Sequence, residues 1–185
     1  RCVRLHPSRR EVKLSHGVRV DLGGIAKGWA ADRAARFLSR WGPCLVDAGG
    51  DIAVRGAPPG WLGWPVGIAD PWREDRDMAV LCLKRGGVAT SGVDYRRWRR
   101  QGRDFHHIIH PRTGTPAQTD LLSVTVWAPS TMWADVMAKV ALILGGRRGW
   151  RWLHARRLPA LMVWRDGRAR LTPEMFPLLW REGWL

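Results

Sequence analysis

The sequence predicts a single α+β domain over residues 1–185, and three observations support this. The 185 residues are 45% hydrophobic and 25% charged, the composition of an ordinary globular domain long enough to bury a core. Strand-like runs and helical patterns alternate without the regular βαβ succession of a parallel sheet. No internal repeat or low-complexity linker interrupts them.

The first half of the chain is expected to hold one helix among several strands. Residues 12–20 are predicted as a strand pair turned at Ser15-His16-Gly17, and a glycine-rich turn follows over 21–28. The next segment is an amphipathic helix that ends at Gly42-Pro43. Its expected buried face consists of Ala30, Ala34, Phe37, Leu38 and Trp41. Strands are expected at 44–48, 65–69 and 78–83, with a loop over 56–63.

The second half continues with strands at 105–109 and 123–127. A second helix is predicted over 132–144, ending at Gly145-Gly146, and a third, arginine-rich helix over 149–157. Residues 161–164 and 168–171 are predicted as a hairpin around Asp166-Gly167, because Asp-Gly is a favoured two-residue turn.

The chain is strongly basic, with 31 Lys plus Arg against 16 Asp plus Glu and a formal net charge of +15. Such a charge favours anionic partners such as nucleic acid, acidic lipid or phosphorylated ligands. A general preference for arginine on a solvated surface explains the same excess. The composition excludes a disordered or collagen-like chain, and every apolar run is shorter than the ~18 residues that a membrane span needs.

The segment VDLGGIAKG, residues 20–28, lies between a strand and a helix. Small residues let a ligand approach the backbone, the helix N-terminus offers unpaired N–H groups, and Lys27 adds a charge. Together these features suit a phosphate. The same residues also describe a plain glycine-rich turn with a surface lysine.

Two further turns carry polar groups after strands. In DAGGDI, residues 47–52, the carboxylates of Asp47 and Asp51 suit a metal or a ribose hydroxyl, or they stabilise a turn through Asx hydrogen bonds. The segment VATSG, residues 88–92, is predicted as a small-residue turn after a strand.

The segment HHIIHPRTG, residues 106–114, gathers three histidines. Adjacent His106 and His107 on a strand point to opposite faces, which argues against a three-histidine zinc site. One of these histidines is a candidate general base, and Arg112 is a candidate phosphate ligand. In WADVMAK, residues 133–139, Asp135 and Lys139 share a helix face and form either an i,i+4 salt bridge or part of a Mg²⁺ site.

In their order and content these blocks closely resemble the ApbE family, over about Val18 to Gly146. The blocks are VDLGGIAKG, DAGGDI, ATSG, HIIHPRTGTP and SVTV followed by WADVMAKVALILG. The resemblance implies an ApbE-like mixed sheet with packed helices. It also implies an FAD:protein FMN transferase, which uses Mg²⁺ to transfer FMN from FAD to a Ser or Thr hydroxyl of a target flavoprotein and releases AMP. Some members instead cleave FAD to FMN and AMP.

The resemblance also implies roles for individual residues. His107 would be the base that activates the acceptor hydroxyl, and Asp135 a catalytic, metal-binding carboxylate. The implied cofactor-binding residues are Asp21, Lys27, Thr90, Ile109 and Arg112. The implied metal positions are Gly24 through its backbone carbonyl, Asp135, Ala138 and Lys139.

Three features depart from the family pattern. Lys139 stands where the family usually has threonine, and a protonated lysine would replace the cation or reach a phosphate rather than ligate Mg²⁺. His110 stands in place of a carboxylate. The family's long N-terminal segment is expected to be missing, since about twenty residues precede the first block.

These departures keep a second reading open, namely a degenerate or fragmentary flavin-binding homologue without transfer activity. The +15 charge keeps a third, a basic nucleic-acid-binding module. The resemblance implies a periplasmic or inner-membrane-associated location, although no signal peptide is recognisable. The acceptor protein and the oligomeric state are not indicated by the sequence.

Overall fold

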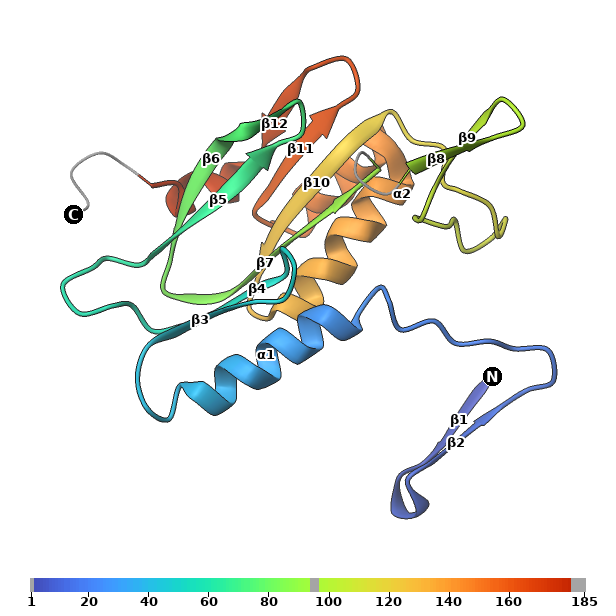
Figure 1. Cartoon of the computed structure of the whole chain (residues 1–185), viewed down its shortest axis with the longest axis horizontal. Coiled ribbons are helices and arrows are strands. Elements are labelled where there is room, and N and C mark those ends of the chain that lie inside the picture. The colour runs from blue at the N-terminus through green and yellow to red at the C-terminus, as the bar shows by residue number, and fades with distance from the viewer. Residues whose placement is uncertain (1, 94–96, 181–185) are drawn as a thin grey trace.

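A six-stranded sheet forms the centre of the molecule (Figure 1). The structure, a computed structural model, describes residues 2–93 and 97–180, except for the side chains at 74, 100, 103 and 104. Across the sheet the strands are β12 (Ala169–Leu171), β11 (Ala160–Trp164), β10 (Leu121–Ala128), β7 (Arg85–Gly92), β4 (Ile52–Arg55) and β3 (Cys44–Asp47). Every ladder between these strands is antiparallel. The predicted α+β class is confirmed, and the sheet that was expected to be mixed is antiparallel.

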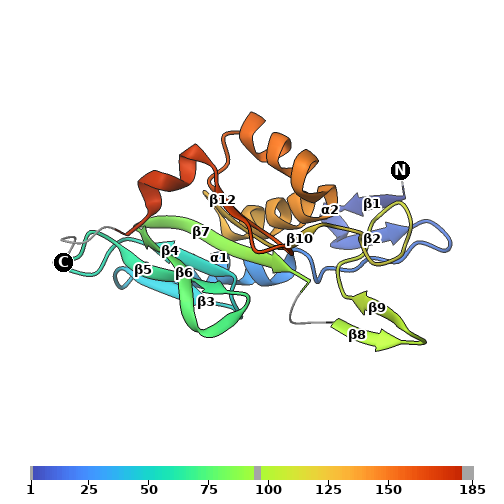
Figure 2. The same ribbon diagram turned by 90° about the horizontal axis from the view of Figure 1, so that it is seen from above.

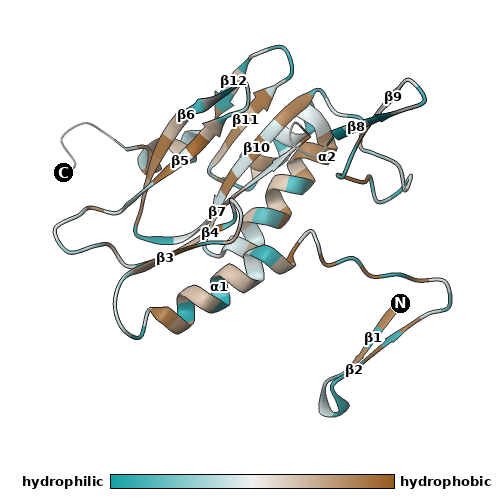
Figure 3. Ribbon diagram, viewed as in Figure 1, coloured by the Kyte–Doolittle hydropathy of each residue, from teal (hydrophilic) through white to brown (hydrophobic). Residues whose placement is uncertain are grey.

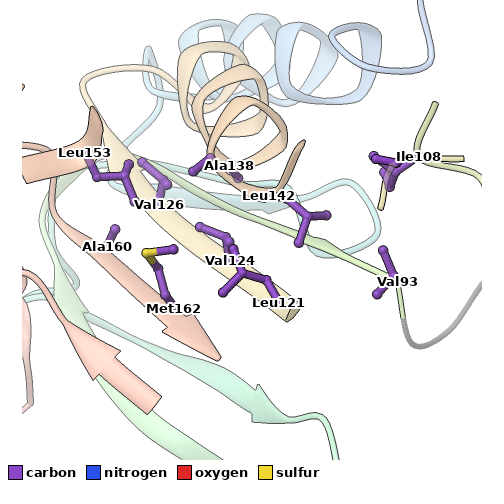
Figure 4. Packing of buried hydrophobic residues seen from close by; sticks show 12 residues of the cluster. Val93, Ile108, Leu121, Val124, Val126, Ala138, Leu142, Leu153, Ala160 and Met162 are labelled. Atoms are coloured by element: carbon purple, nitrogen blue, oxygen red, sulfur yellow. The ribbon is translucent and has the colours of Figure 1, made fainter. Parts of the chain in front are cut away.

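Different layers cover the two faces of the sheet (Figure 2). One face carries α1 (Ala26–Leu38) and α2 (Thr131–Ala155), and the other carries the β5–β6 hairpin (Trp64–Asp70 and Arg73–Leu83) and the 3-10 helix η2 (Pro173–Leu178). On β11, Met162 joins the core under α2, whereas its neighbours Leu161 and Val163 join the core under the hairpin. Figure 4 shows Met162 beside Val124 and Val126 of β10, in the core that α2 covers.

Two small hairpins lie outside this sheet (Figure 1). The β8–β9 hairpin (Arg97–Arg100 and Arg103–His106) is hydrophilic (Figure 3). The β1–β2 hairpin (Val3–His6 and Glu11–Leu14) turns through the 3-10 helix η1 (Pro7–Arg9), and all its strand residues are exposed. The strand pair predicted over 12–20 was therefore wrong, because Val3 pairs with Leu14 and the residues after Leu14 close a turn from Ser15 to Val18.

The helix predicted after the glycine-rich turn forms as α1, but the predicted buried face was wrong. The residues that face the core are Gly28, Ala31 and Ala35, while Phe37 and Trp41 are exposed. α1 lies close enough to β3, β4 and α2 that only small side chains fit between them. The large aromatic residues therefore point outward.

The second and third predicted helices form one element, α2, with a kink. Gly145 has φ 76° and ψ 171°, which interrupts the helix where the sequence predicted its end. The segment VATSG, predicted as a turn, lies instead inside β7 at the centre of the sheet. Its residues are small because α2 packs directly on this strand, where Ala89 contacts Ala134.

Most of the other predicted elements are confirmed with small changes of boundary. The strands predicted at 44–48, 65–69, 78–83 and 123–127, the hairpin around Asp166-Gly167 and the loop over 56–63 all form. The strand predicted at 105–109 ends at His106. Within the described residues, no helix is long and apolar enough to cross a membrane.

Candidate active site

Four charged side chains meet where α1, α2 and the turn before β4 come together, and we call them the Asp–Lys cluster: Lys27, Asp51, Asp135 and Lys139. On α2, Nζ of Lys139 donates a hydrogen bond to Oδ1 of Asp135, one turn earlier. Nζ of Lys27 lies 3.1 Å from Oδ2 of Asp51. Both aspartates are only 1% exposed, and the charge of Asp135 acts on Asp51. The cluster is therefore two adjacent ion pairs with buried carboxylates.

Asp32 of α1 holds the start of α2 in place. Its two carboxylate oxygens accept hydrogen bonds from the backbone N–H groups of Thr131 (2.9 Å) and Met132 (3.0 Å). These donors belong to the first turn of α2 and have no partner within the helix. Asp32 therefore caps one helix from another, and this fixes Lys27 of α1 relative to Asp135 of α2.

Thr131 ties the same helix start to the sheet. Its hydroxyl donates to the carbonyl of Ile52 at 3.1 Å, directly after Asp51 in the sequence. Gly28 lets the two helices approach, since a Cβ there would stand 2.8 Å from the backbone of Thr131 and Met132. These contacts bring Asp51 and Asp135 together although 84 positions separate them in the sequence.

The two buried carboxylates are incompletely satisfied. Within the part of the chain that the structure describes, Oδ2 of Asp135 is buried without a hydrogen-bond partner, and Oδ2 of Asp51 has the ion pair with Lys27 but no hydrogen bond. Burial raises the pKa of Asp51 above its ordinary value, and the charge of Asp135 raises it further, while Lys27 opposes both effects. The site therefore holds more negative charge than its hydrogen bonds stabilise.

The raised pKa of Asp51 predicts how the stability of the fold depends on pH. The folded state binds the Asp51 proton more tightly than the unfolded state does. Protonation of Asp51 therefore contributes its full stabilisation below the ordinary aspartate pKa, and this contribution is lost as the pH rises through the pKa of Asp51 in the folded state. At pH values above its folded pKa the ionised Asp51 therefore costs stability. We expect Asp51→Asn to raise Tm at pH 7, by about 2–4 °C for each kcal/mol of relieved cost. The gain should disappear below the ordinary aspartate pKa.

Asp47 provides the matched control for this measurement, which is thermal unfolding across pH. It lies in the same turn, is exposed, and accepts a hydrogen bond from the N–H of Gly50 at 2.7 Å. Asp47→Asn should not raise Tm at neutral pH. A lower Tm for Asp51→Asn than for the parent at pH 7 would contradict the assignment of a destabilising charge to Asp51.

Gly24 lies beside the Asp–Lys cluster, in the loop before α1. A Cβ at Gly24 would stand 3.0 Å from Cε of Lys139, so the glycine leaves room for the lysine side chain. In the same loop, Oδ1 of Asp21 accepts a 2.7 Å hydrogen bond from the N–H of Gly23. Among the described residues no side chain caps the first turn of α1, and the N–H of Ala26 donates to the backbone carbonyl of Leu22 at 2.8 Å.

The histidine segment packs against α2. Residues 108–110 pair with 115–117, Ile108 enters the core (Figure 4), and the flanking His107 and Ile109 are exposed. A hollow of about 280 Å³ between this segment and α2 is lined by Arg112 among others. His106 is buried and hydrogen-bonded through Nε2 to the carbonyl of Ala117 at 2.9 Å. The two adjacent histidines thus differ in exposure, and the strand on which both were expected ends at His106.

The structure places two of the proposed site residues away from the cluster. Thr90 lies on the face of β7 opposite to α2, where its hydroxyl is 2.8 Å from that of Thr125. Ala138 is fully buried in the core inside α2, where its methyl group only packs and helical hydrogen bonds occupy backbone carbonyls. We therefore leave Ala138 out of the metal site.

A broad open hollow of about 800 Å³ lies elsewhere, at the kink of α2. It is lined by Asp120 and the arginines 147, 148 and 151, and contains none of the sequence-predicted site residues. One carboxylate oxygen of Asp120 accepts from the N–H of Gly146 at 2.7 Å and so caps the helical segment after the kink. This explains the conformation of the kink without a ligand.

From the sequence, Asp51 was predicted only as one of two turn carboxylates, and Asp32 was not predicted as a site residue. A signal for Asp51 was present, because an aspartate that directly precedes a buried strand is placed at the edge of the core. Nothing in the sequence around Asp32 distinguishes it from an ordinary helix acid. Its role depends on contacts 99 and 100 positions away.

Comparison with known proteins defines the class of protein to which this chain belongs. The model of the ApbE family matches residues 1–162, so this chain is a member of the ApbE family. It spans about half the length of the curated relatives that it matches. Two relatives are named FAD:protein FMN transferase. One, from Treponema pallidum, is 38% identical over 170 residues, covering 84% of this chain and 46% of that protein. The other, from Vibrio cholerae, is 36% identical over 149 residues, covering 78% and 44%.

Solved structures agree with this assignment. The ApbE protein from Thermotoga maritima superposes with a TM-score of 0.86 at 31% identity, over 97% of this chain and 60% of that chain. The flavin transferase ApbE from Vibrio cholerae gives 0.78 at 30% identity, over 96% and 58%. The likeness thus extends to the sheet and both helices that build the Asp–Lys cluster.

Proposed function

We propose that this chain is an FAD:protein FMN transferase that moves FMN from FAD to a Ser or Thr hydroxyl of an acceptor flavoprotein. The observation that carries the proposal is the buried carboxylate of Asp135, which keeps an unpartnered oxygen near the uncapped start of α1. Diphosphate chemistry uses carboxylates for a metal and backbone N–H groups for phosphate oxygens. The names of the curated relatives support the choice of reaction.

We propose that the buried carboxylates of Asp51 and Asp135, each with an oxygen that lacks a hydrogen bond among the described residues, would hold a Mg²⁺ ion. Among residues 2–93 and 97–180, no three His, Cys, Asp or Glu side chains are grouped to hold a metal by themselves. Mg²⁺ is usually bound through one or two carboxylates together with substrate phosphates, so two carboxylates suffice. We propose the backbone carbonyl of Gly24 as a further ligand. When bound, the ion would neutralise negative charge on the diphosphate.

The remaining residues take roles around the reacting diphosphate. The acceptor hydroxyl oxygen bonds to the flavin-side phosphorus, the bond from that phosphorus to the bridging oxygen breaks, and AMP leaves with the bridging oxygen. His107, which is exposed, takes the hydroxyl proton. Lys27 and the first turn of α1 bind phosphate oxygens. The further FAD contacts that we propose are Asp21, Ile109 and Arg112, whereas Thr90 lies on the opposite face of the sheet and is left out.

The experiment is AMP release from FAD by the purified chain, with Mg²⁺ and with EDTA. We expect AMP in the presence of Mg²⁺ and a large loss with EDTA. Release of AMP that EDTA leaves unchanged would contradict the role given to the carboxylates. Absence of AMP with either addition would contradict the transferase proposal.

One observation favours a second candidate, a flavin-binding homologue without transfer activity. The ammonium of Lys139 already pairs with Asp135, the carboxylate that the reaction needs for its metal. FAD-induced thermal stabilisation without AMP release would identify this binder, because a ligand of the folded state raises Tm by mass action. AMP release together with stabilisation would identify the enzyme.

A further inference from the structure

Lys139 occupies the space that a cation would take beside Asp135. Its Nζ donates to Oδ1 of Asp135, and its stem passes Gly24, the other proposed metal position. The side chain of Lys139 is 24% exposed, whereas that of Asp135 is 2% exposed. The ammonium group therefore approaches the buried carboxylate from the solvent side.

The charges of the Asp–Lys cluster balance only because the two lysines are present. Two buried carboxylates without counter-ions would be strongly destabilising, since burying an unpaired charge is costly. Lys27 compensates Asp51 and Lys139 compensates Asp135. The two lysines thus supply counter-charges without a metal, and one oxygen of Asp135 stays without a hydrogen-bond partner among the described residues.

A divalent cation on the unpartnered Oδ2 of Asp135 and the Lys139 ammonium on Oδ1 would repel each other at close range. The repulsion between like charges is strong within a few ångströms, and strongest where water is excluded. A lysine stem is flexible and its ammonium is readily hydrated, so Lys139 can leave toward solvent or toward an anionic ligand. Metal binding at Asp135 is therefore weakened while the ammonium stays, and it favours movement of the lysine.

We propose that Lys139 is an internal cation that competes with Mg²⁺ for Asp135. When a metal binds, the Lys139 ammonium would leave Asp135 and would be free to pair with an anionic group such as a phosphate. The metal affinity of the free chain is consequently lower than that of a variant with a neutral residue at 139. This inference rests on the proposed function for the identity of the metal and the nucleotide. The competition itself is a property of Asp135 and Lys139.

The test measures Mn²⁺ binding to the full chain without nucleotide, by electron paramagnetic resonance and by the Mn²⁺-induced rise in Tm. Lys139→Gln is the principal variant, because it removes the charge and keeps an N–H donor for Asp135. Lys139→Thr is the second, because it removes the charge and adds a small oxygen ligand. We expect Kd for Mn²⁺ to fall about tenfold or more in both variants, with a correspondingly larger Tm rise.

Lys84→Met is the matched control, since Lys84 is exposed between β6 and β7 and its loss changes the net charge equally. It should leave Kd unchanged. Two results would contradict the proposed competition. One is a Lys139→Gln variant that binds Mn²⁺ no more tightly than the parent, and the other is a Lys84→Met variant that tightens Mn²⁺ binding as much as Lys139→Gln does. Tighter binding without AMP release would keep this inference and remove the proposed function. AMP release by the parent chain, together with an unchanged Kd in Lys139→Gln, would overturn this inference and keep the proposed function.

Discussion

Asp135→Asn is expected to lower Mg²⁺-dependent AMP release by at least about 100-fold, equivalent to roughly 3 kcal/mol of lost transition-state stabilisation. The asparagine has nearly the same shape but carries no charge, so it neither holds a divalent cation firmly nor compensates Lys139. Initial rates of AMP formation at saturating FAD measure the effect. Mn²⁺ binding measured on the same preparation should weaken in parallel.

Asp166→Asn is the control for this substitution. Asp166 lies in the turn between β11 and β12, is exposed, and pairs with Arg168 at 2.8 Å. Its loss should change neither the rate nor the metal affinity. If Asp135→Asn kept the parental rate, Asp135 would have no part in the mechanism.

Gly28→Ala is expected to destabilise the fold by about 1–3 kcal/mol, the usual range for an overpacked core. The added methyl group would stand 2.8 Å from backbone atoms of Thr131 and Met132, which cannot rotate away as a side chain would. The better helix propensity of alanine, worth about 1 kcal/mol, opposes this effect and is included in the range. Because α1 and α2 must separate, metal binding at Asp135 should weaken too.

Denaturant unfolding of Gly28→Ala measures the first effect, and Mn²⁺ titration measures the second. Ala30→Ser, at an exposed position of the same helix, changes one small group without meeting α2 and serves as the control. A Gly28→Ala variant as stable as the parent, with unchanged metal affinity, would show that the close approach of the two helices does not position the site.

Local patterns predicted those parts of the molecule whose contacts are local. The Asp135–Lys139 pair follows from a separation of four residues on one helix, and the ion pair forms. The Asp166-Gly167 turn likewise depends on residues next to each other, and the hairpin forms as predicted. Gly145 interrupts α2 at the predicted position because glycine, which has no Cβ, adopts a positive φ without strain.

Features that depend on distant contacts were predicted poorly. The aromatic residues of α1 indicated a buried face, but the short distance to α2 and the sheet selected the small residues Gly28, Ala31 and Ala35 instead. The small residues of β7 were likewise misinterpreted as a turn. They are small because α2 packs directly on this strand. Asp51 joins the site through a distant contact, because Thr131 hydrogen-bonds to the carbonyl of Ile52, which lies 79 positions earlier in the sequence.

The most direct test of the account is the mass of a threonine-bearing acceptor peptide after incubation with the chain, FAD and Mg²⁺. We expect a mass gain of one FMN moiety on the peptide and an equal amount of AMP. A control peptide with alanine in place of the threonine should gain no FMN, and no AMP should form with it unless the chain also hydrolyses FAD. AMP without any flavin on the peptide would reduce the activity to FAD hydrolysis. An unmodified peptide with no AMP would contradict the transferase function.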